Sequence, residues 1–391
     1  MKRDIQHDIS QRIEAARVLC IATMMFVHVR HYEPAAAAEL AAASYGAFEL
    51  LEAFLRDAKG RASVSLLSII SGYLIWATLA KGAKLPDLIQ RRFMSICVPM
   101  IIWALIILAV YTLISMFIAP TFLDRGLAET TNPVLYLLNT VFFLTHAPEG
   151  ATLHLAFLRD IFMCVVISPL LLKLIRVAPI LLFTGLVALF VLKINSIIVL
   201  RPLILLSFAI GLFLAEKRVN ISAADRYLPL WAVLFAASSM LIIGWDKGIF
   251  PKAMHELTFA AGPMSFDIKT SVLAPLVRLT GSLFVWTAVA RLAGSAWIMQ
   301  LRPVTFLAYC SHVLALTVIY YAIWRPLVAG PEDAFYPVWF LMAPAVSFAV
   351  AMALFTVLKR ISPTLAAMLS GNRLEPSAGR AGSLKRDTGQ A

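Results

Sequence analysis

Charged residues are scarce in this sequence. Asp, Glu, Lys and Arg together make up 14% of the 391 residues, whereas 61% of the residues are hydrophobic. Soluble domains carry about 25% charged and about 45–50% apolar residues. The scarcity of charge therefore excludes an ordinary soluble protein and predicts an all-α, polytopic integral membrane protein.

Acidic residues are rarer than basic ones, 22 against 34, so the formal net charge is +12. A basic chain can bind nucleic acid, but here Lys and Arg are scattered between apolar runs rather than clustered. Positive charge in short loops sets the cytoplasmic side of a membrane protein. We therefore expect the lipid bilayer, and no nucleic acid, as a partner; the oligomeric state stays open.

Cysteines are also few. Cys20, Cys97, Cys164 and Cys310 each lie inside an apolar run, and none shows the spacing of metal ligands. Buried thiols of this kind act as small apolar side chains. We expect neither a disulfide nor a metal site.

The start of the chain could imitate a secretory signal, because basic residues, an apolar run and an Ala-rich stretch at 35–43 follow one another. The apolar run, however, contains Arg17 and ends near His28 and His31, which makes it too polar for that role. We expect it to remain as a membrane helix.

The apolar runs predict about ten transmembrane helices. They cover residues 13–32, 63–80, 94–118, 152–175, 177–192, 202–215, 228–244, 271–293, 304–324 and 336–358. The basic short loops place both termini in the cytoplasm. The domains are then a cytoplasmic N-terminus (1–12), a membrane domain (13–358) and a basic, disordered cytoplasmic tail (359–391).

The longer loops, 33–62, 119–151 and 245–270, are expected outside. Residues 44–57 have the apolar spacing of an amphipathic helix at the outer interface. It could be a simple linker or a lid over a site.

Arg17 and His28 dominate the chemistry of the first apolar run. In a helix they would lie roughly 16 Å apart, about half of a hydrocarbon core of ~30 Å. A central Arg costs at least ~2.5 kcal/mol on insertion scales, so it faces a partner or a wet cavity. We therefore predict that the two side chains lie at opposite depths of one polar passage through the membrane.

Further ionisable residues inside the predicted spans are His154, Arg159, Asp160, Arg278 and His312. Adjacent Arg159 and Asp160 are not expected to face each other on one helix, so each should have a partner elsewhere. Structural ion pairs are the plainer interpretation of these two, and a satisfied interior histidine that of His312.

Five motifs occur in a fixed order. They are R-I-E-A-A-R from Arg12 with ten residues between Arg17 and His28, R-A-S-V-S-L-L-S-I-I-S-G-Y-L from Arg61, R-R-F-M-S-I-C-V-P-M-I-I-W from Arg91, H-L-A-F-L-R-D from His154, and F-L-A-Y-C-S-H up to His312. Together they resemble membrane acyltransferase family 3 over almost the whole chain. Ser95 stands where the family often has an Arg, and Ser65 and Ala156 replace a Pro and a Trp.

The resemblance implies an enzyme of the bacterial inner membrane that moves an acyl group from cytoplasmic acyl-CoA to a sugar hydroxyl. The similar branch decorates exopolysaccharides and periplasmic glucans with acetyl or succinyl groups. Acyl-CoA would be a co-substrate, with no permanently bound cofactor, and a polysaccharide or glucan the acceptor. The acyl group stays open; Arg61, Arg159 and Arg278 are all candidates to pair with a succinyl carboxylate.

The implied roles divide between the two sides of the membrane. Arg17 and His28 are the expected catalytic residues, with His28 taking the hydroxyl proton. Arg17, Arg91 and Arg92 would bind the phosphates of acyl-CoA. The expected supporting residues are Arg61, Ser71, Tyr73, His154, Arg159, Asp160 and His312, of which Arg61, Ser71 and Tyr73 could donate to a developing oxyanion.

Two other classes compete with this interpretation. A transporter or flippase-like carrier of a lipid-linked sugar would also need intramembrane Arg and His, but such proteins commonly show inverted repeats with broken helices, and none is evident here. A non-catalytic assembly subunit of a polysaccharide machine is the third. No Ser-His-Asp order is evident, which favours direct transfer over an acyl-enzyme.

Overall fold

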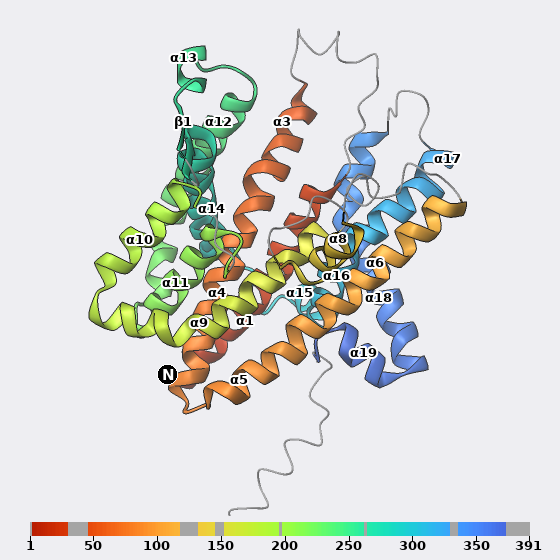
Figure 1. The fold of residues 1–391 in the computed structure, drawn as a ribbon, viewed down its shortest axis with the longest axis horizontal. Helices are drawn as coiled ribbons and strands as arrows, with labels where there is room; N and C mark the ends of the chain where they lie inside the picture. The colour runs from red at the N-terminus through yellow and green to blue at the C-terminus, as the bar shows by residue number, and fades with distance from the viewer. Residues whose placement is uncertain are drawn as a thin grey trace, which may run out of the picture.

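A computed structural model describes residues 2–29, 46–117, 132–144, 152–194, 198–261, 264–328 and 335–372. The described chain is a bundle of helices with a small hairpin at one end (Figure 1). By length and composition, seven helical stretches could cross a membrane: Ala47–Ala80, Leu85–Met116, Leu153–Val177, Ile221–Asp246, Lys269–Val289, Ala296–Leu327 and Tyr336–Ile361. The chain is therefore a mostly helical, multi-pass membrane protein.

Six of these seven stretches consist of consecutive segments, and the last is a single helix. They are α3 (Ala47–Ala53), η2 (Phe54–Gly60) and α4 (Arg61–Ala80); α5 (Leu85–Arg92), η3 (Phe93–Cys97) and α6 (Val98–Phe117); η5 (Leu153–Leu155) and α9 (Ala156–Val177); η6 (Ile221–Tyr227) and α12 (Leu228–Asp246); η7 (Lys269–Leu273) and α14 (Ala274–Val289); α15 (Ala296–Leu301), η8 (Arg302–Val304), α16 (Thr305–Ile319), η9 (Tyr320–Trp324) and α17 (Arg325–Leu327); and α18 (Tyr336–Ile361). The remaining elements are α1 (Lys2–Met25), η1 (Phe26–His28), α8 (Pro133–Phe142), α10 (Pro179–Val191), α11 (Pro202–Glu216), α13 (Lys252–His255), β1 (Thr258–Ala261), β2 (Met264–Asp267) and α19 (Pro363–Leu369).

The predicted count of about ten spans is not confirmed. The three additional predicted spans fall on α1, α10 and α11, which are helices but do not meet the same criterion. With 13 and 15 residues, α10 and α11 reach only about 20–22 Å, less than the ~30 Å hydrocarbon core. The first half of α1 carries too many charges.

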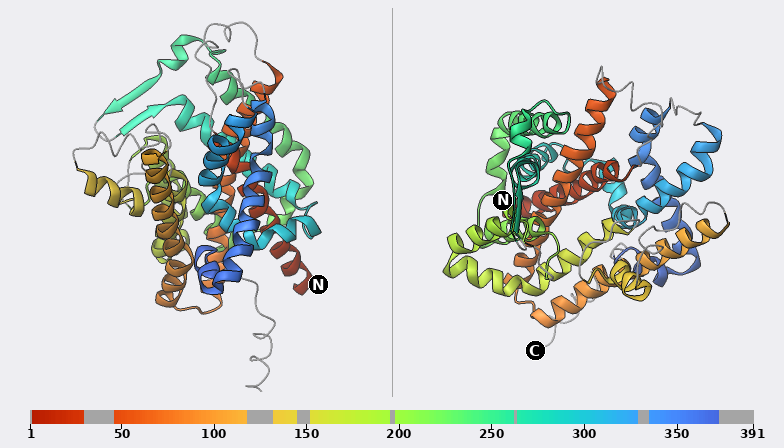
Figure 2. Two further views of the ribbon diagram at one scale, coloured as in Figure 1. Left: turned by 90° about the vertical axis from the view of Figure 1, so that its right-hand side faces the viewer. Right: turned by 45° about the horizontal axis from the view of Figure 1, so that its top comes forward.

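Helix α1 nevertheless runs through the middle of the bundle, against α4, α14, α16 and α18 (Figures 1 and 2). Its small residues Ala15, Ala16 and Cys20 are fully buried. The helix begins well before the predicted span 13–32 and ends at Met25, where a 3₁₀ turn carries His28. The end of that predicted span, from residue 30, lies outside the described residues.

The predicted interfacial helix at 44–57 is wrong as a separate element. From Ala47 the chain is one continuous helix through to Ala80, with a π-helical segment, η2, in the middle. Phe48 packs edge-on against Tyr336 and Phe340, with ring centroids 6.1 and 5.8 Å apart. These aromatic contacts hold Phe48 of α3 against α18, whereas Leu50 and Leu51 are exposed.

A purely α-helical fold is also wrong in one detail, because β1 and β2 form an antiparallel hairpin inside the predicted outer loop 245–270. Phe259 and Phe266 lie opposite each other in its register. Ser265 donates its backbone N–H to the carbonyl of Leu192, and Asp267 forms an ion pair with Lys193. The hairpin is thus fastened to the end of α10.

Both described ends of the chain lie on the side of α5, away from α13 and β1 (Figure 1). Trp103 of α6 donates its indole N–H to the carbonyl of Leu369 at 3.2 Å, which fixes α19 there. The predicted tail 359–391 therefore begins as helix, whereas residues 373–391 lie outside the described part. That this side faces the cytoplasm stays a prediction.

The closest helix packing joins α4 to α11, and two glycines permit it. A Cβ at Gly72 would lie 2.1 Å from the carbonyl oxygen of Phe208, and a Cβ at Gly211 would lie 2.0 Å from that of Ile69. Small residues let backbones approach in membranes, where packing drives helix association.

Replacing Gly211 with Val should therefore separate α4 from α11 and lower the melting temperature of the detergent-purified protein by several degrees. Gly185→Val is the matched control, because a Cβ at Gly185 of α10 meets nothing within 4 Å. Equal melting temperatures for the two variants, read by fluorescence-detected gel filtration, would contradict this packing.

Candidate active site

Arg12 fixes the position of α1 in the bundle. Its guanidinium is buried and donates two hydrogen bonds to Asp225, at 2.9 and 2.5 Å. It also donates to the carbonyl of Trp286 and lies 4.0 Å from the centre of that indole ring. This paired, cation-π-stacked arginine joins α1 to η6 and α14.

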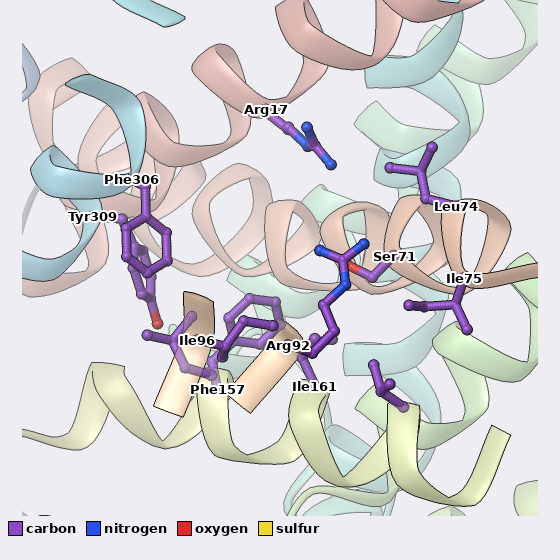
Figure 3. A pocket seen from close by; sticks show the side chains of 12 residues that line it. Arg17, Ser71, Leu74, Ile75, Arg92, Ile96, Phe157, Ile161, Phe306 and Tyr309 are labelled. Atoms are coloured by element: carbon purple, nitrogen blue, oxygen red, sulfur yellow. The ribbon is translucent and has the colours of Figure 1, made fainter. Parts of the chain in front are cut away.

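One turn and a half further along α1, Arg17 enters a cavity of about 90 Å³ that we name the Arg17 cavity. Arg17, Ser71 and Arg92 approach it from α1, α4 and α5 (Figure 3). Arg17 also pairs with Glu14 at 2.7 Å, and Ser71 donates to the carbonyl of Leu67 at 2.8 Å. Two arginines converging on one space suit an anion with several oxygens.

A second cavity, of about 270 Å³, lies at the C-terminal end of α1, and we name it the His28 cavity. Its polar wall contains two histidines and three arginines: His28, His154, Arg61, Arg201 and Arg278. They come from η1, η5, α4, the residue before α11, and α14. Five distant segments of the sequence thus supply one basic cavity.

Three imidazoles meet beside this cavity. The ring centroids of His28 lie 5.7 Å from His154 and 5.1 Å from His312, and those of His154 and His312 are 4.9 Å apart. In the part of the chain that the structure describes, no group of three or more His, Cys, Asp or Glu side chains is arranged to hold a metal ion. The edge of this cavity thus brings three imidazoles together.

Backbone carbonyls decide which nitrogen carries the proton in two of these rings. Nδ1 of His312 lies 2.6 Å from the carbonyl oxygen of Tyr309, and Nε2 of His154 lies 3.2 Å from that of Cys310. A carbonyl only accepts, so each of these nitrogens donates. In the neutral rings the other nitrogens, Nε2 of His312 and Nδ1 of His154, carry lone pairs.

Phe157 lines both cavities. Its ring centroid lies 6.2 Å from that of Tyr309, whose hydroxyl donates to the carbonyl of His154. Tyr309 lines the Arg17 cavity and His154 the His28 cavity. These three side chains therefore form the wall between the two cavities, and Arg17 and His28 lie on opposite sides of it.

The prediction that Arg159 and Asp160 cannot meet is wrong. Arg159 Nη1 lies 3.1 Å from Asp160 Oδ1, because the long Arg side chain bends back over its neighbour. The expected distant partners are also present: Arg159 donates to the carbonyl of Ile198, and the N–H of Leu200 donates to Asp160. The pair thus holds the segment from Ile198 to Leu200, which leads directly to Arg201.

Two predicted site residues lie elsewhere. Arg91 is exposed and donates to the carbonyl of Asp87 at 3.1 Å, and it does not line the Arg17 cavity. Tyr73 lines an apolar groove of about 410 Å³ between α4, α11 and α14. Arg91 precedes the cavity residue Arg92 by one position and Tyr73 follows Ser71 by two, so each leaves its helix in a different direction from that neighbour.

Sequence reasoning missed Arg201 and Phe157 as cavity residues and Arg12 as the anchor of α1. Arg201 lies between the predicted spans 177–192 and 202–215. Its location directly before Pro202, at the start of a helix inside an apolar region, was the available signal. Arg201 donates to the carbonyl of Leu153 at 3.0 Å, which brings it beside His154.

Comparison with known proteins gives the class of this helical membrane protein, whose two cavities lie along α1 and the η1 turn that follows it. The family model described as "Acyltransferase domain", that of acyltransferase family 3, matches residues 10–358, and the chain belongs to this family. It is similar to the "Succinoglycan biosynthesis protein ExoH" of Rhizobium meliloti (strain 1021), with 26% identity over 371 residues, 94% of this chain and 93% of the relative. No solved structure matches the chain. Membership of this family supports an acyltransferase.

The anchor of α1 gives a stability prediction. Asp225→Asn leaves Arg12 buried without its countercharge, so we expect a loss of about 3 kcal/mol, the lower end for a broken buried pair because Asp225 is 35% exposed. The measurement is chemical or thermal unfolding in detergent. Arg176→Gln, which breaks a pair whose Arg is 60% exposed, should cost at most about 1 kcal/mol. If the two variants are equally stable, Arg12 does not anchor α1.

Proposed function

We propose that this protein is an inner-membrane O-acyltransferase. It takes an acetyl or succinyl group from cytoplasmic acyl-CoA and transfers it to a hydroxyl of an extracytoplasmic or lipid-linked polysaccharide. The observation that carries the proposal is the placement of Arg17 and His28 in two cavities that share the wall of Phe157. A donor and an acceptor can each occupy one cavity and meet at that wall.

The Arg17 cavity suits the donor. Arg17 and Arg92 offer forked guanidinium groups, and acyl-CoA carries several phosphate charges that such groups bind in two-pronged fashion. The cavity is lined by Arg92 of α5, and both described chain ends lie on the side of α5 (Figure 1). The positive charge of the short loops supports this side as the cytoplasmic one.

The His28 cavity suits the reacting hydroxyl. A neutral imidazole accepts the hydroxyl proton while the sugar oxygen attacks the thioester carbonyl; the C–S bond then breaks, and the sulfur of CoA takes a proton as it leaves. The lone pairs of His154 and His312 can accept hydrogen bonds from the imidazolium that His28 becomes. Arg61, which lines the same cavity, can stabilise the oxyanion; Ser71 and Tyr73 do not line it.

Direct transfer fits this arrangement. The step needs a base, a cation that stabilises the oxyanion, and a surface at which the two substrates meet. His28, Arg61 and Phe157 can fill these three roles. A flippase-like carrier remains the alternative activity, and the membership in an acyltransferase family favours the enzyme.

The experiment that tests the proposal replaces His28 with Gln, which can form hydrogen bonds but is not a useful base near neutral pH. We expect acyl transfer to fall by at least about 10², with normal protein abundance and acyl-CoA affinity. The measurement is incorporation of labelled acyl groups into polysaccharide by inverted membrane vesicles from a strain that lacks the gene and expresses each variant. These vesicles contain the native acceptor.

His255→Gln is the matched control, because His255 lies in α13, outside both cavities. Near wild-type transfer by His28→Gln at matched protein amounts would exclude His28 as the base. His312 would then be the next candidate; His31 lies outside the described residues.

A second prediction concerns the donor. Arg17→Lys keeps the charge but removes the forked donor set, so acyl-CoA should bind at least about tenfold more weakly, since a charge-assisted hydrogen bond contributes about 1.5–3 kcal/mol. Equilibrium binding of labelled acyl-CoA to the reconstituted protein measures this. Arg360→Lys, at the exposed end of α18, is the control. An unchanged dissociation constant in Arg17→Lys would show that Arg17 does not bind the donor through its fork.

A further inference from the structure

The His28 cavity is more basic than the transfer reaction alone requires. Arg61, Arg201 and Arg278 all line it, and no Asp or Glu does. Transfer catalysed by a general base needs at most one nearby cation, which stabilises the oxyanion. Three guanidinium groups facing one space inside a membrane protein indicate that the space receives an anion.

The three arginines differ in what else they contact. Arg61 lies near the surface and pairs with Asp57 at 3.3 Å. Arg201 donates to the carbonyl of Leu153. Arg278 has no ion pair with any described residue, and its Nε is buried without a hydrogen-bond partner. Arg201 has no ion pair with a described residue either, but it has the carbonyl of Leu153 as a partner; Arg278 is thus the guanidinium in this cavity that has neither an ion pair nor a hydrogen bond to a described residue.

An unbalanced arginine on α14 is costly, because burying an unpaired charge is expensive unless a counter-ion joins it. The apolar side chains Met24, Val27 and Leu203, also in the cavity wall, add to the desolvation. By contrast, Arg159, the other candidate cation in this region, is paired with Asp160 and the carbonyl of Ile198. A ligand with a single negative charge would balance Arg278.

We propose that Arg278, supported by Arg201, binds the terminal carboxylate of a dicarboxylic acyl group while its thioester carbonyl lies beside His28. This inference rests on the proposed acyltransferase function and names its donor: a succinyl-class thioester rather than an acetyl one. The phosphates of CoA have their own arginines in the Arg17 cavity, and sugar hydroxyls are neutral. The distal carboxylate is then the anion that reaches the His28 cavity.

Butyryl-CoA provides the sharpest comparison with succinyl-CoA, because a methyl group replaces the carboxylate at the same chain length. In the inverted vesicles described above, the wild-type protein should transfer succinyl at least about tenfold faster than butyryl or acetyl at low donor concentration. Arg278→Gln should remove that preference by lowering succinyl transfer at least about tenfold, with butyryl transfer changed less than about threefold. Arg278→Lys, which keeps a positive charge, should retain part of the preference.

Arg291→Gln is the matched control, an exposed arginine just beyond the same helix, and it should leave the preference unchanged. Equal transfer of succinyl and butyryl by the wild type would overturn the carboxylate subsite, as would equal loss of both donors in Arg278→Gln. The latter would assign the anion to an acidic or phosphorylated acceptor. If Arg278→Gln does not accumulate in the membrane, Arg278→Lys decides: an unaltered preference with a shorter, unforked cation would also count against the subsite. Absence of transfer from every donor by the wild type would instead refute the acyltransferase proposal itself.

Discussion

The two-pronged bond between Arg12 and Asp225, with the indole of Trp286 stacked on the guanidinium, is the contact on which the site depends. It fixes the rotation and depth of α1, which carries Arg17 and continues directly into the η1 turn that carries His28. A rotation of the helix by one residue would turn them by about 100°. Buried Arg12 thus has a structural role: it positions the helix so that Arg17, the other arginine of the same motif, faces a cavity.

The two cavities divide the charges of the molecule. The Arg17 cavity contains two arginines from separate helices, and the His28 cavity combines three arginines with two histidines. Phe157 and Tyr309 separate them with aromatic rings rather than with charge. In the proposed transfer, the uncharged thioester would lie against these rings, where exclusion of water would limit its competition with the sugar hydroxyl.

The motifs around Arg17, Ser71, Arg92 and His154 predicted residues that the fold does bring to the cavities, because each motif lies on one helix and its spacing fixes a face. The sequence could not predict contacts that depend on distant segments. Arg201 enters the His28 cavity only because Asp160 holds the backbone of Leu200. Likewise, the residues of α3 have amphipathic spacing that fits an interface, but their aromatic partners lie almost 300 residues away on α18.

The central claim is that donor and acceptor meet at the wall between Arg17 and His28. A cryo-electron microscopy structure of the protein with a non-hydrolysable thioether analogue of succinyl-CoA tests it most directly. We predict that the CoA phosphates lie against Arg17 and Arg92 and that the acyl chain passes Phe157. The carbon that replaces the thioester carbonyl carbon should lie beside His28. Density for the analogue in the apolar groove beside Tyr73, or an acyl chain directed away from His28, would contradict it.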